Sequence, residues 1–251
     1  MQPAPLSRAE VSDRITTVVN IVRTAHILSP YDKQDFNAAL LVWKAIAGIP
    51  AVERPLLLKA LLPKDICQLW KLASQRRKAS AQQLREALGP DYSLWDDFPE
   101  HPGQVVVYQG LAALPLHFWF GRFKKSFFLH PNTFELYGRV GVEKGVLGDM
   151  LYSLYFKGAI APTAVPATAE VADVALEYTP PERLGLTARD LPRGRGWAPP
   201  APLRWPFGGG LTDYMRPIGP GVYVGSGWKE PQEGSHELGC RFLKFLLVRQ
   251  A

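Results

Sequence analysis

Residues 213–228 have the sequence DYMRPIGPGVYVGSGW, and this aromatic and glycine-rich stretch says most about the fold. Glycines inside a strand let it coil sharply, or let a ligand approach the backbone closely. Val222–Trp228 is predicted as a strand within the stretch, and the apolar segment RFLKFLLVR, residues 241–249, is predicted as the last strand. We therefore expect the C-terminal part of the chain to be rich in β-structure.

The same aromatic and glycine-rich composition begins near residue 92, where the apolar residues start to recur at every second position. Leu136 and Val140 share one face of such a segment, opposite Tyr137 and Arg139. The seven predicted strands are Val105–Gln109, Phe118–Phe128, Glu135–Val142, Leu151–Ile160, Val171–Tyr178, Val222–Trp228 and Arg241–Arg249. No helical pattern lies between them, and this succession favours a closed antiparallel barrel or a sandwich over a parallel sheet.

The first ~90 residues have a helical period instead. Ser7 and Glu10 form a capping-box pattern ahead of the first helix, and Asp32 is the expected cap of the second. Cys67 falls in an apolar helix and is expected in the core. The predicted helices cover residues 7–28, 32–47, 52–62, 63–73 and 81–88, and the last ends at Gly89-Pro90.

These patterns predict an α+β chain with an N-terminal helical segment followed by an antiparallel β-barrel. Residues 1–90 are expected to form a helical domain or arm, and residues 91–251 the barrel. The segment 180–206 is rich in Pro and Arg and has no period, so we expect a long irregular loop there, an excursion from the barrel rim.

Composition limits the class of protein, its compartment and its partners. Hydrophobic residues make up 47% of the 251 residues, which is enough for a core, and no apolar run reaches the length of a membrane helix. Two cysteines indicate either a reducing compartment or simply buried thiols. The N-terminal Ser, Thr and Arg residues fit either a transit peptide or an ordinary first helix, so a plastid or the cytoplasm is expected. The net charge of +6 is scattered, which argues against nucleic acid but leaves peripheral membrane association open.

The residue types that carry catalysis or bind metals occur in no recognisable motif. The five histidines do not recur at a helical spacing and none has a nearby cysteine, so no metal site is predicted. Gly208-Gly209-Gly210 lacks the lysine of a phosphate loop, and no G-x-S-x-G elbow is present. The sequence therefore predicts no catalytic residue and no cofactor.

One resemblance rests on the order of motifs across residues 100–251. A Trp-x-Gly-Arg segment at 119–122, the alternating strands, RPIGPGVYVG at 216–225 and the apolar last strand resemble lipocalin-like (calycin) barrels. The nearest group is the plastid lipid-associated, or fibrillin-type, proteins. The resemblance implies that Trp119 lies at a closed end of the barrel and that Arg249 stacks on it. The helical N-terminal third has no counterpart in that family.

The leading hypothesis is a non-enzymatic barrel that binds or transports a small lipophilic molecule, such as a lipid, pigment or isoprenoid. An interior lined by aromatic rings suits an apolar ligand, and Arg122 and Arg216 are the candidates for its polar head group. A small filled barrel whose rings merely pack is the competing interpretation. The candidate ligand-binding residues are Trp119, Arg122, Phe123, Tyr155, Tyr178, Arg216, Tyr223 and Trp228.

Two other functions stay open from the sequence. Trp43, Trp70 and the apolar helix faces of residues 1–90 fit an interaction module that docks a protein partner. A barrel enzyme, such as an isomerase or a hydrolase, would need a polar group like His117 or His130 directed into the cavity.

Overall fold

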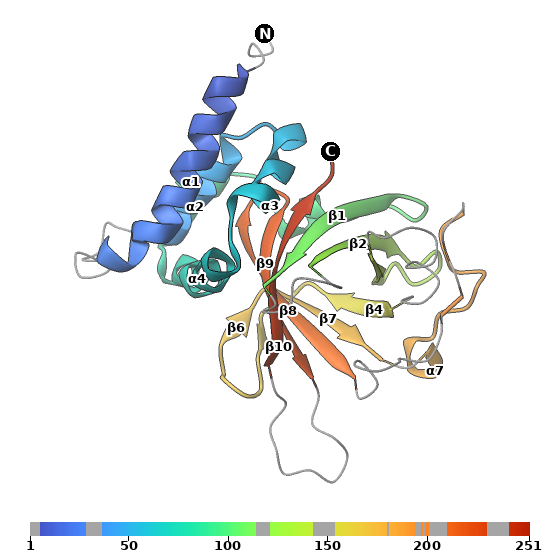
Figure 1. Cartoon of the computed structure of the whole chain (residues 1–251). Helices are drawn as coiled ribbons and strands as arrows, with labels where there is room; N and C mark the ends of the chain where they lie inside the picture. Colours follow the sequence, from blue (N-terminus) through green and yellow to red (C-terminus); the bar gives the residue numbers. More distant parts are fainter. Residues whose placement is uncertain are drawn as a thin grey trace.

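The computed structural model describes residues 6–28, 37–113, 121–142, 154–179, 181–193, 197, 199–200, 210–229 and 241–251. Helices occupy the N-terminal part and pack on one side of a barrel (Figure 1). They are α1 (Arg8–Leu28), α2 (Ala38–Ala47), α3 (Leu57–Ala60), α4 (Pro63–Ala73) and α5 (Ala81–Leu88), with 3-10 turns η2 (Ala51–Leu56), η3 (Ser74–Lys78) and η4 (Leu94–Asp97).

Eight antiparallel strands close into the barrel, which confirms the predicted α+β class with helices before a β-barrel. Their order around it is β1-β10-β9-β8-β7-β4-β3-β2. The strands are β1 (Val105–Ala112), β2 (Arg122–Leu129), β3 (Leu136–Val142), β4 (Leu154–Ala159), β7 (Val174–Tyr178), β8 (Leu211–Gly219), β9 (Val222–Lys229) and β10 (Arg241–Arg249). A separate two-stranded sheet, β5 (Thr163–Ala164) and β6 (Val171–Ala172), lies between β4 and β7 in the chain.

Strand β8 is the barrel strand that is missing from the seven predicted ones, and the short β5 was not predicted either. Pro217 lies inside β8, and proline is rare in paired strands because it has no N–H to donate. The register of β8 against β9 shifts between Pro217 and Gly219, so the proline is accommodated at an irregularity. The turn that follows uses Gly221, whose φ of 66° is in the left-handed region.

The helix predictions hold closely for α1, α4 and α5. Helix α2 begins later than predicted, because the Asn37 side chain accepts hydrogen bonds from the N–H groups of Ala39 and Leu40 and caps it there. Asp32, the predicted cap, is outside the described residues. The prediction for Cys67 is wrong: its thiol is free and exposed on α4, because the turn directs Ile66 and Leu69 inward instead.

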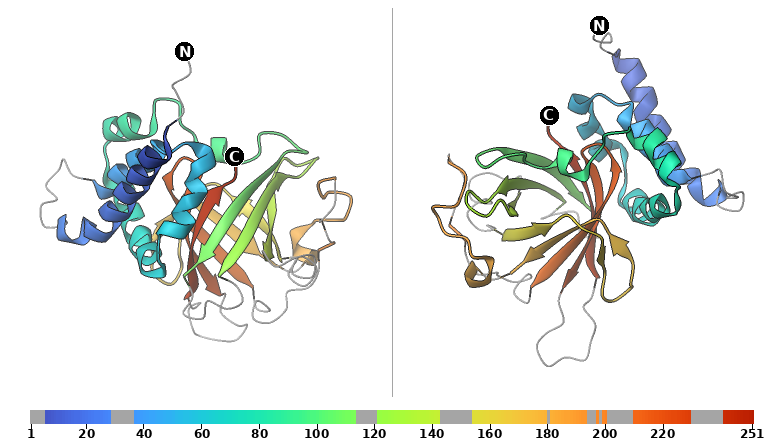
Figure 2. Two further views of the ribbon diagram at one scale, coloured as in Figure 1. Left: turned by 45° about the horizontal axis from the view of Figure 1, so that its top comes forward. Right: turned by 180° about the vertical axis from the view of Figure 1, so that it is seen from behind.

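The N-terminal helices cover the outer face of β8, β9 and β10, and both views in Figure 2 show them on the same side of the barrel. One apolar cluster joins the two parts; it includes Val18, Ile46, Leu69, Ile218, Val222, Val224, Leu246 and Val248. Arg216 on β8 fastens α4 by donating to the carbonyl oxygens of Trp70, at 2.7 Å, and Val171, at 2.8 Å. Its guanidinium lies 3.9 Å from the centre of the Trp70 ring.

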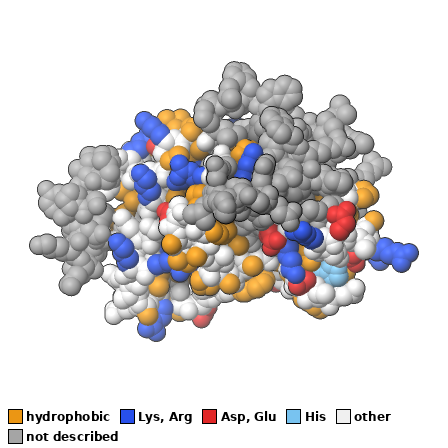
Figure 3. Space-filling view, turned by 90° about the horizontal axis from the view of Figure 1, so that it is seen from below, with side chains coloured by type: hydrophobic (Ala, Val, Ile, Leu, Met, Phe, Trp, Pro, Cys, Tyr) orange, Lys and Arg blue, Asp and Glu red, His pale blue; other side chains and the backbone are white. Residues whose placement is uncertain are grey.

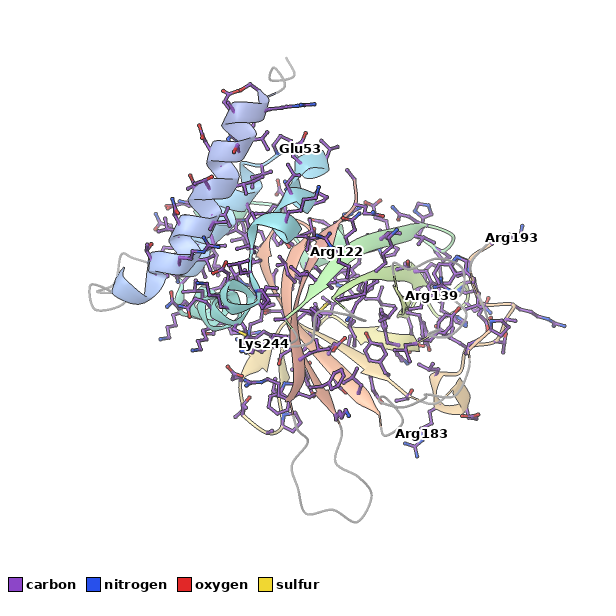
Figure 4. The ribbon with its side chains drawn as sticks, in the orientation of Figure 1. Glu53, Arg122, Arg139, Arg183, Arg193 and Lys244 are labelled. Atoms are coloured by element: carbon purple, nitrogen blue, oxygen red, sulfur yellow. The ribbon has the colours of Figure 1, made fainter. Side chains whose placement is uncertain are left out.

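The described part of segment 180–206 is not an excursion into solvent. Helix α7 (Pro181–Leu184) and the residues after it pack on the outer face of β2, β3 and β4, where Leu184 and Leu186 are buried. The Tyr137 hydroxyl donates to the Leu184 carbonyl oxygen at 2.9 Å. Arg183 and Arg193 point away from the barrel (Figure 4), so this segment buries its apolar residues and exposes its basic ones.

One end of the barrel, called here the plugged end, is closed by η4. The buried Asp97 carboxylate accepts hydrogen bonds of 2.8 Å from the hydroxyls of Tyr92 and Tyr223 and from the N–H of Gly221. Arg249 donates to the Asp96 carbonyl oxygen at 2.7 Å. The opposite end, called the loop end, is where β2, β4, β8 and β10 begin and β1, β3, β7 and β9 finish.

Candidate ligand-binding site inside the barrel

Strand alternation decides which side chains fill the barrel lumen, because successive residues point to opposite faces of a sheet. The described lumen residues are mainly aromatic and aliphatic, and Lys125 and Asp213 are the charged ones among those that are buried; Lys229 at the loop end and Arg249 at the plugged end share the lumen parity of their strands but are only partly buried. The lumen set includes Val106, Tyr108, Phe123, Lys125, Phe127, Leu136, Phe156, Val174, Leu176, Tyr178, Leu211, Asp213, Met215, Tyr223, Phe245 and Leu247.

Lys125 and Asp213 form an ion pair across the lumen. They belong to β2 and β8, which are four strands apart in either direction around the barrel and so face each other. The Lys125 ammonium contacts Oδ2 of Asp213, and the Tyr178 hydroxyl donates to the same oxygen at 2.8 Å. Lys125 is 1% exposed and Asp213 is 4% exposed, so the pair is dry. We call Lys125, Asp213 and Tyr178 the lumen triad.

Burial sets the protonation behaviour of the triad. Removing the ammonium from water disfavours its charged form, and this lowers the pKa of Lys125 although Asp213 opposes the shift. The pKa of Tyr178 lies well above its usual range, because its anion would be desolvated and would face the Asp213 carboxylate. Tyr178 therefore stays a hydroxyl and keeps donating its proton to Asp213.

Aromatic rings surround the Lys125 ammonium. Its Nζ lies 4.3 Å from the ring centre of Phe245, 5.5 Å from Tyr178, 5.7 Å from Phe156 and 6.0 Å from Phe123. The negative faces of such rings attract a cation, and the attraction is stronger where water is excluded. The rings and the carboxylate together hold one charged amine in an otherwise apolar barrel.

Three glycines, each on a strand next to the one that carries the ring, make room for three of these rings. Gly110 is paired with Phe123, Gly138 with Phe156, and Gly225 with Phe245. A Cβ added at these glycines would lie 2.4 Å, 2.4 Å and 2.1 Å from the respective ring, too close for any side chain. The rings thus lie flat against glycine backbone, which explains why glycine is needed inside these strands.

The plugged half of the lumen is filled by side chains. Phe98, Tyr108, Phe127 and Tyr223 contact one another edge-on or tilted, with ring centres 5.1–6.4 Å apart. The triad lies beyond them, nearer the loop end: Asp213 is the third residue of β8, and Phe123, two residues before Lys125, is the second of β2. The ion pair thus lies between the plug and the loop end of the barrel.

The described residues among those predicted to bind a ligand fall into two groups, one inside the barrel and one outside it. Phe123, Tyr178 and Tyr223 face the lumen, although Tyr223 belongs to the plug. The other described residues face outward or lie at the surface: Tyr155 is under segment 184–197, Arg216 is against Trp70, Trp228 packs beside the helix-covered cluster, and Arg122 is exposed. Arg216 is therefore not a lumen head-group ligand, because its strand parity turns it toward α4.

Two further predictions concern tryptophan and histidine. Trp119 and His117 lie outside the described residues; their described neighbours Ala113 and Gly121 are at the loop end, whereas Arg249 is at the plugged end. His130 is outside the lumen, where its Nε2 lies 3.5 Å from an oxygen of Asp190. Strands β1 and β10 pair directly, as closure of the barrel requires.

The sequence analysis missed Lys125 and Asp213, although a signal for both was present. In β2 the lumen positions are Phe123, Lys125 and Phe127, and in β8 they are Leu211, Asp213 and Met215. The signal is a charged residue among the alternate positions of a strand that are otherwise apolar. Such a side chain is either buried with a partner or incompatible with the strand.

Other features of the described residues and the comparisons add little to the site. No group of three His, Cys, Asp or Glu side chains gathers in the described part of the chain, and no described helix is long and apolar enough to cross a membrane. Lys and Arg side chains are scattered among acidic and hydrophobic ones on the face seen in Figure 3. No known protein family, curated protein or solved structure matches this chain.

Proposed function

We propose that the barrel binds a small lipophilic molecule, without chemically converting it, from the loop end. The apolar part of the ligand lies among the rings nearest the loop end, and its polar end rests on the lumen triad. The observation that carries this proposal is the dry ion pair between Lys125 and Asp213.

That pair is hard to explain as a device for stability alone. Taking two charges out of water costs several kcal/mol each, and replacing such pairs by apolar residues of similar volume is often neutral or stabilising by about 1–4 kcal/mol. A filled barrel would need only another apolar pair at these positions. A polar group at the floor of an apolar lumen instead supports recognition, since ligand sites combine apolar walls with a few placed polar groups.

The charges of the triad favour an uncharged end group on the ligand. Lys125 is a donor and Asp213 is an acceptor, so a hydroxyl can accept from Lys125 and donate to Asp213, whereas a carbonyl oxygen can accept from Lys125. A carboxylate would be attracted by Lys125 but repelled by Asp213, which already neutralises that lysine. Alcohols, aldehydes and ketones are therefore the proposed classes, ahead of fatty acids.

The other two functions have less support among the described residues. Trp43 and Trp70, which suggested a docking surface, are 0% and 1% exposed because they pack inside the molecule. His130, the described candidate for barrel catalysis, lies outside the lumen beside Asp190.

A chain-length series tests the proposal. The protein is titrated with 1-hexanol, 1-octanol and 1-decanol, and with decanoate, by isothermal calorimetry. Each buried methylene contributes about 0.8 kcal/mol, so affinity should rise about fourfold per added carbon, and decanol should bind more tightly than decanoate at neutral pH. An affinity that does not change with chain length, or no saturable binding of any of the four, would contradict the proposal.

A further inference from the structure

The lumen triad has the groups needed for covalent attachment of a ligand as well as for hydrogen bonds to its polar end. Building on the proposed function, we infer that Lys125 is a covalent attachment point: its amine condenses reversibly with a lipophilic aldehyde, and Asp213 is the counterion of the imine that forms. The ligand class is thereby narrowed from neutral lipophiles to carbonyl compounds.

The geometry places the amine where an aldehyde that enters from the loop end would meet it. Lys125 and Asp213 are each two residues farther into the barrel than Phe123 and Leu211, which corresponds to about 7 Å of strand. Phe123 is 9% exposed, whereas Phe156, Tyr178 and Phe245 are at most 1% exposed, so Phe123 is the ring on the side of approach. Phe123 belongs to β2 near the loop end and not to the ring cluster of the plug, so an aldehyde that enters meets this ring before the amine.

The surroundings suit an amine that reacts with a carbonyl group. Attack requires the unprotonated amine, and burial favours that form by lowering the pKa of Lys125. The amine is also held in place, since the ion pair and the rings fix its position, and it is the buried amine of the described lumen, whereas Lys229 lies half-buried at the rim of the loop end. Lys124, the next residue, points out of the barrel and lacks this setting.

The condensation balances with the groups present. The Lys125 ammonium first passes a proton to the Asp213 carboxylate. The amine nitrogen then forms a bond to the carbonyl carbon, the electron pair of the C=O bond moves to oxygen, and the nitrogen, now positively charged, passes one of its protons to that oxygen, which gives a neutral carbinolamine. The C–O bond of this adduct breaks as Asp213 returns its proton, water leaves, and nitrogen forms the C=N bond.

The net change is Lys–NH₃⁺ plus R–CHO giving Lys–NH⁺=CH–R plus water, with no oxidant or reductant. The product keeps the single positive charge beside Asp213, so the ion pair of the free protein is replaced by an equivalent one. Tyr178 keeps donating to Asp213 and so orients the carboxylate toward nitrogen throughout. Hydrolysis follows the same steps in reverse, which makes the attachment reversible.

Borohydride trapping tests the inference on the full chain. The protein is incubated with decanal at neutral pH and reduced with sodium borohydride, which converts an imine into a stable secondary amine. We expect one added mass equal to that of decanal less one oxygen atom, and a peptide map that places it on Lys125. Excess 1-decanol, which occupies the lumen but forms no imine, should suppress the label.

Matched variants separate this site from surface amines. K124M removes a lysine from the outer face of the same strand and should label like the parent protein, whereas K125M should lose the specific label. If K125M does not fold, the peptide map of the parent protein decides the question without it. K125R adds a second variant that keeps a cation beside Asp213 and forms no imine.

The outcomes separate this inference from the proposed function. Saturable binding of 1-decanol, with decanal label spread over surface lysines and none on Lys125, would overturn the inference and leave the proposed function standing. Absence of decanol binding together with an unlabelled Lys125 would overturn both. Label on Lys125 that decanol suppresses supports both.

Discussion

The ion pair between Lys125 and Asp213 predicts a specific pattern of stability changes. D213N keeps the size of the side chain and an oxygen for the Tyr178 hydroxyl, but it leaves the Lys125 ammonium buried without a counterion. The two side chains are only 1% and 6% exposed, so solvent offers little screening. We expect D213N and K125M each to lower the free energy of unfolding by about 3–5 kcal/mol.

The double variant K125M/D213N should recover most of that loss. Methionine follows the course of the lysine stem, and no uncompensated charge remains in the lumen. Its stability should lie near that of the parent protein, or above it by up to about 4 kcal/mol. The two changes thus couple by about 3 kcal/mol or more, far beyond the additivity expected of independent sites.

Equilibrium urea unfolding, followed by tryptophan fluorescence, measures these differences at a common m-value. The control is E135Q at the exposed pair between Lys157 and Glu135, whose nitrogen and oxygen are 2.6 Å apart but whose side chains are 45% and 42% exposed. That pair should contribute below about 1 kcal/mol, because water screens it. A D213N loss as small as that of E135Q would refute the idea of a dry, charged pair.

The pH dependence of D213N gives a second check. Without its counterion, Lys125 has a folded-state pKa still further below its unfolded value. D213N is therefore most stable at high pH, where the buried amine is neutral, and it loses stability as the pH falls through the folded-state pKa of Lys125. The deficit of D213N against the parent protein should therefore shrink as the pH is raised from 7 toward 10. A deficit that does not change over this range would show that charge burial is not its cause.

Three further changes have predictable effects on urea unfolding. G225A forces the Phe245 ring off the backbone, where a Cβ would lie 2.1 Å from it, and should lower stability by about 1–3 kcal/mol; an unchanged midpoint would contradict the packing described. R216M leaves the Trp70 and Val171 carbonyl oxygens unpaired and should lower it by about 3 kcal/mol, while R183M, on the exposed side of α7, should stay within about 0.5 kcal/mol. D97N tests the plug, because burial raises the folded-state pKa of Asp97. The free energy of unfolding of the parent protein should exceed that of D97N most below pH 3.8, and the difference should shrink as the pH rises through the raised pKa. A difference that grows with pH would contradict this.

The sequence predicted the fold well where local patterns and tertiary structure agree. The alternation of apolar residues in 136–140 and 174–178 appears directly as lumen and outer faces, and the capping and breaker residues bounded α1, α4 and α5. Strand β8 was missed because Pro217 is a local signal against a strand, and only the register irregularity beside it accommodates the proline.

The site was predicted less well, because its chemistry depends on closure of the barrel. Asp213 and Lys125 are 88 residues apart in sequence and become partners only when β2 and β8 face each other across the lumen. Arg216 was chosen for its aromatic and glycine-rich setting, yet its parity on β8 turns it toward α4, which the sequence of the strand alone does not reveal. Residue type suggested the arginines, whereas the pairing of Lys125 with Asp213 becomes visible only in the topology.

The central claim is that the polar end of a neutral lipophile rests on the lumen triad. The most direct test compares the affinity of 1-decanol for the parent protein, for K124M and for K125M/D213N by isothermal calorimetry. Hydrogen bonds to charged groups contribute about 1.5–3 kcal/mol, so the double variant should bind about tenfold to a hundredfold more weakly, while K124M should match the parent protein. Equal affinity in all three proteins would show that Lys125 and Asp213 take no part in binding, and it would contradict the account.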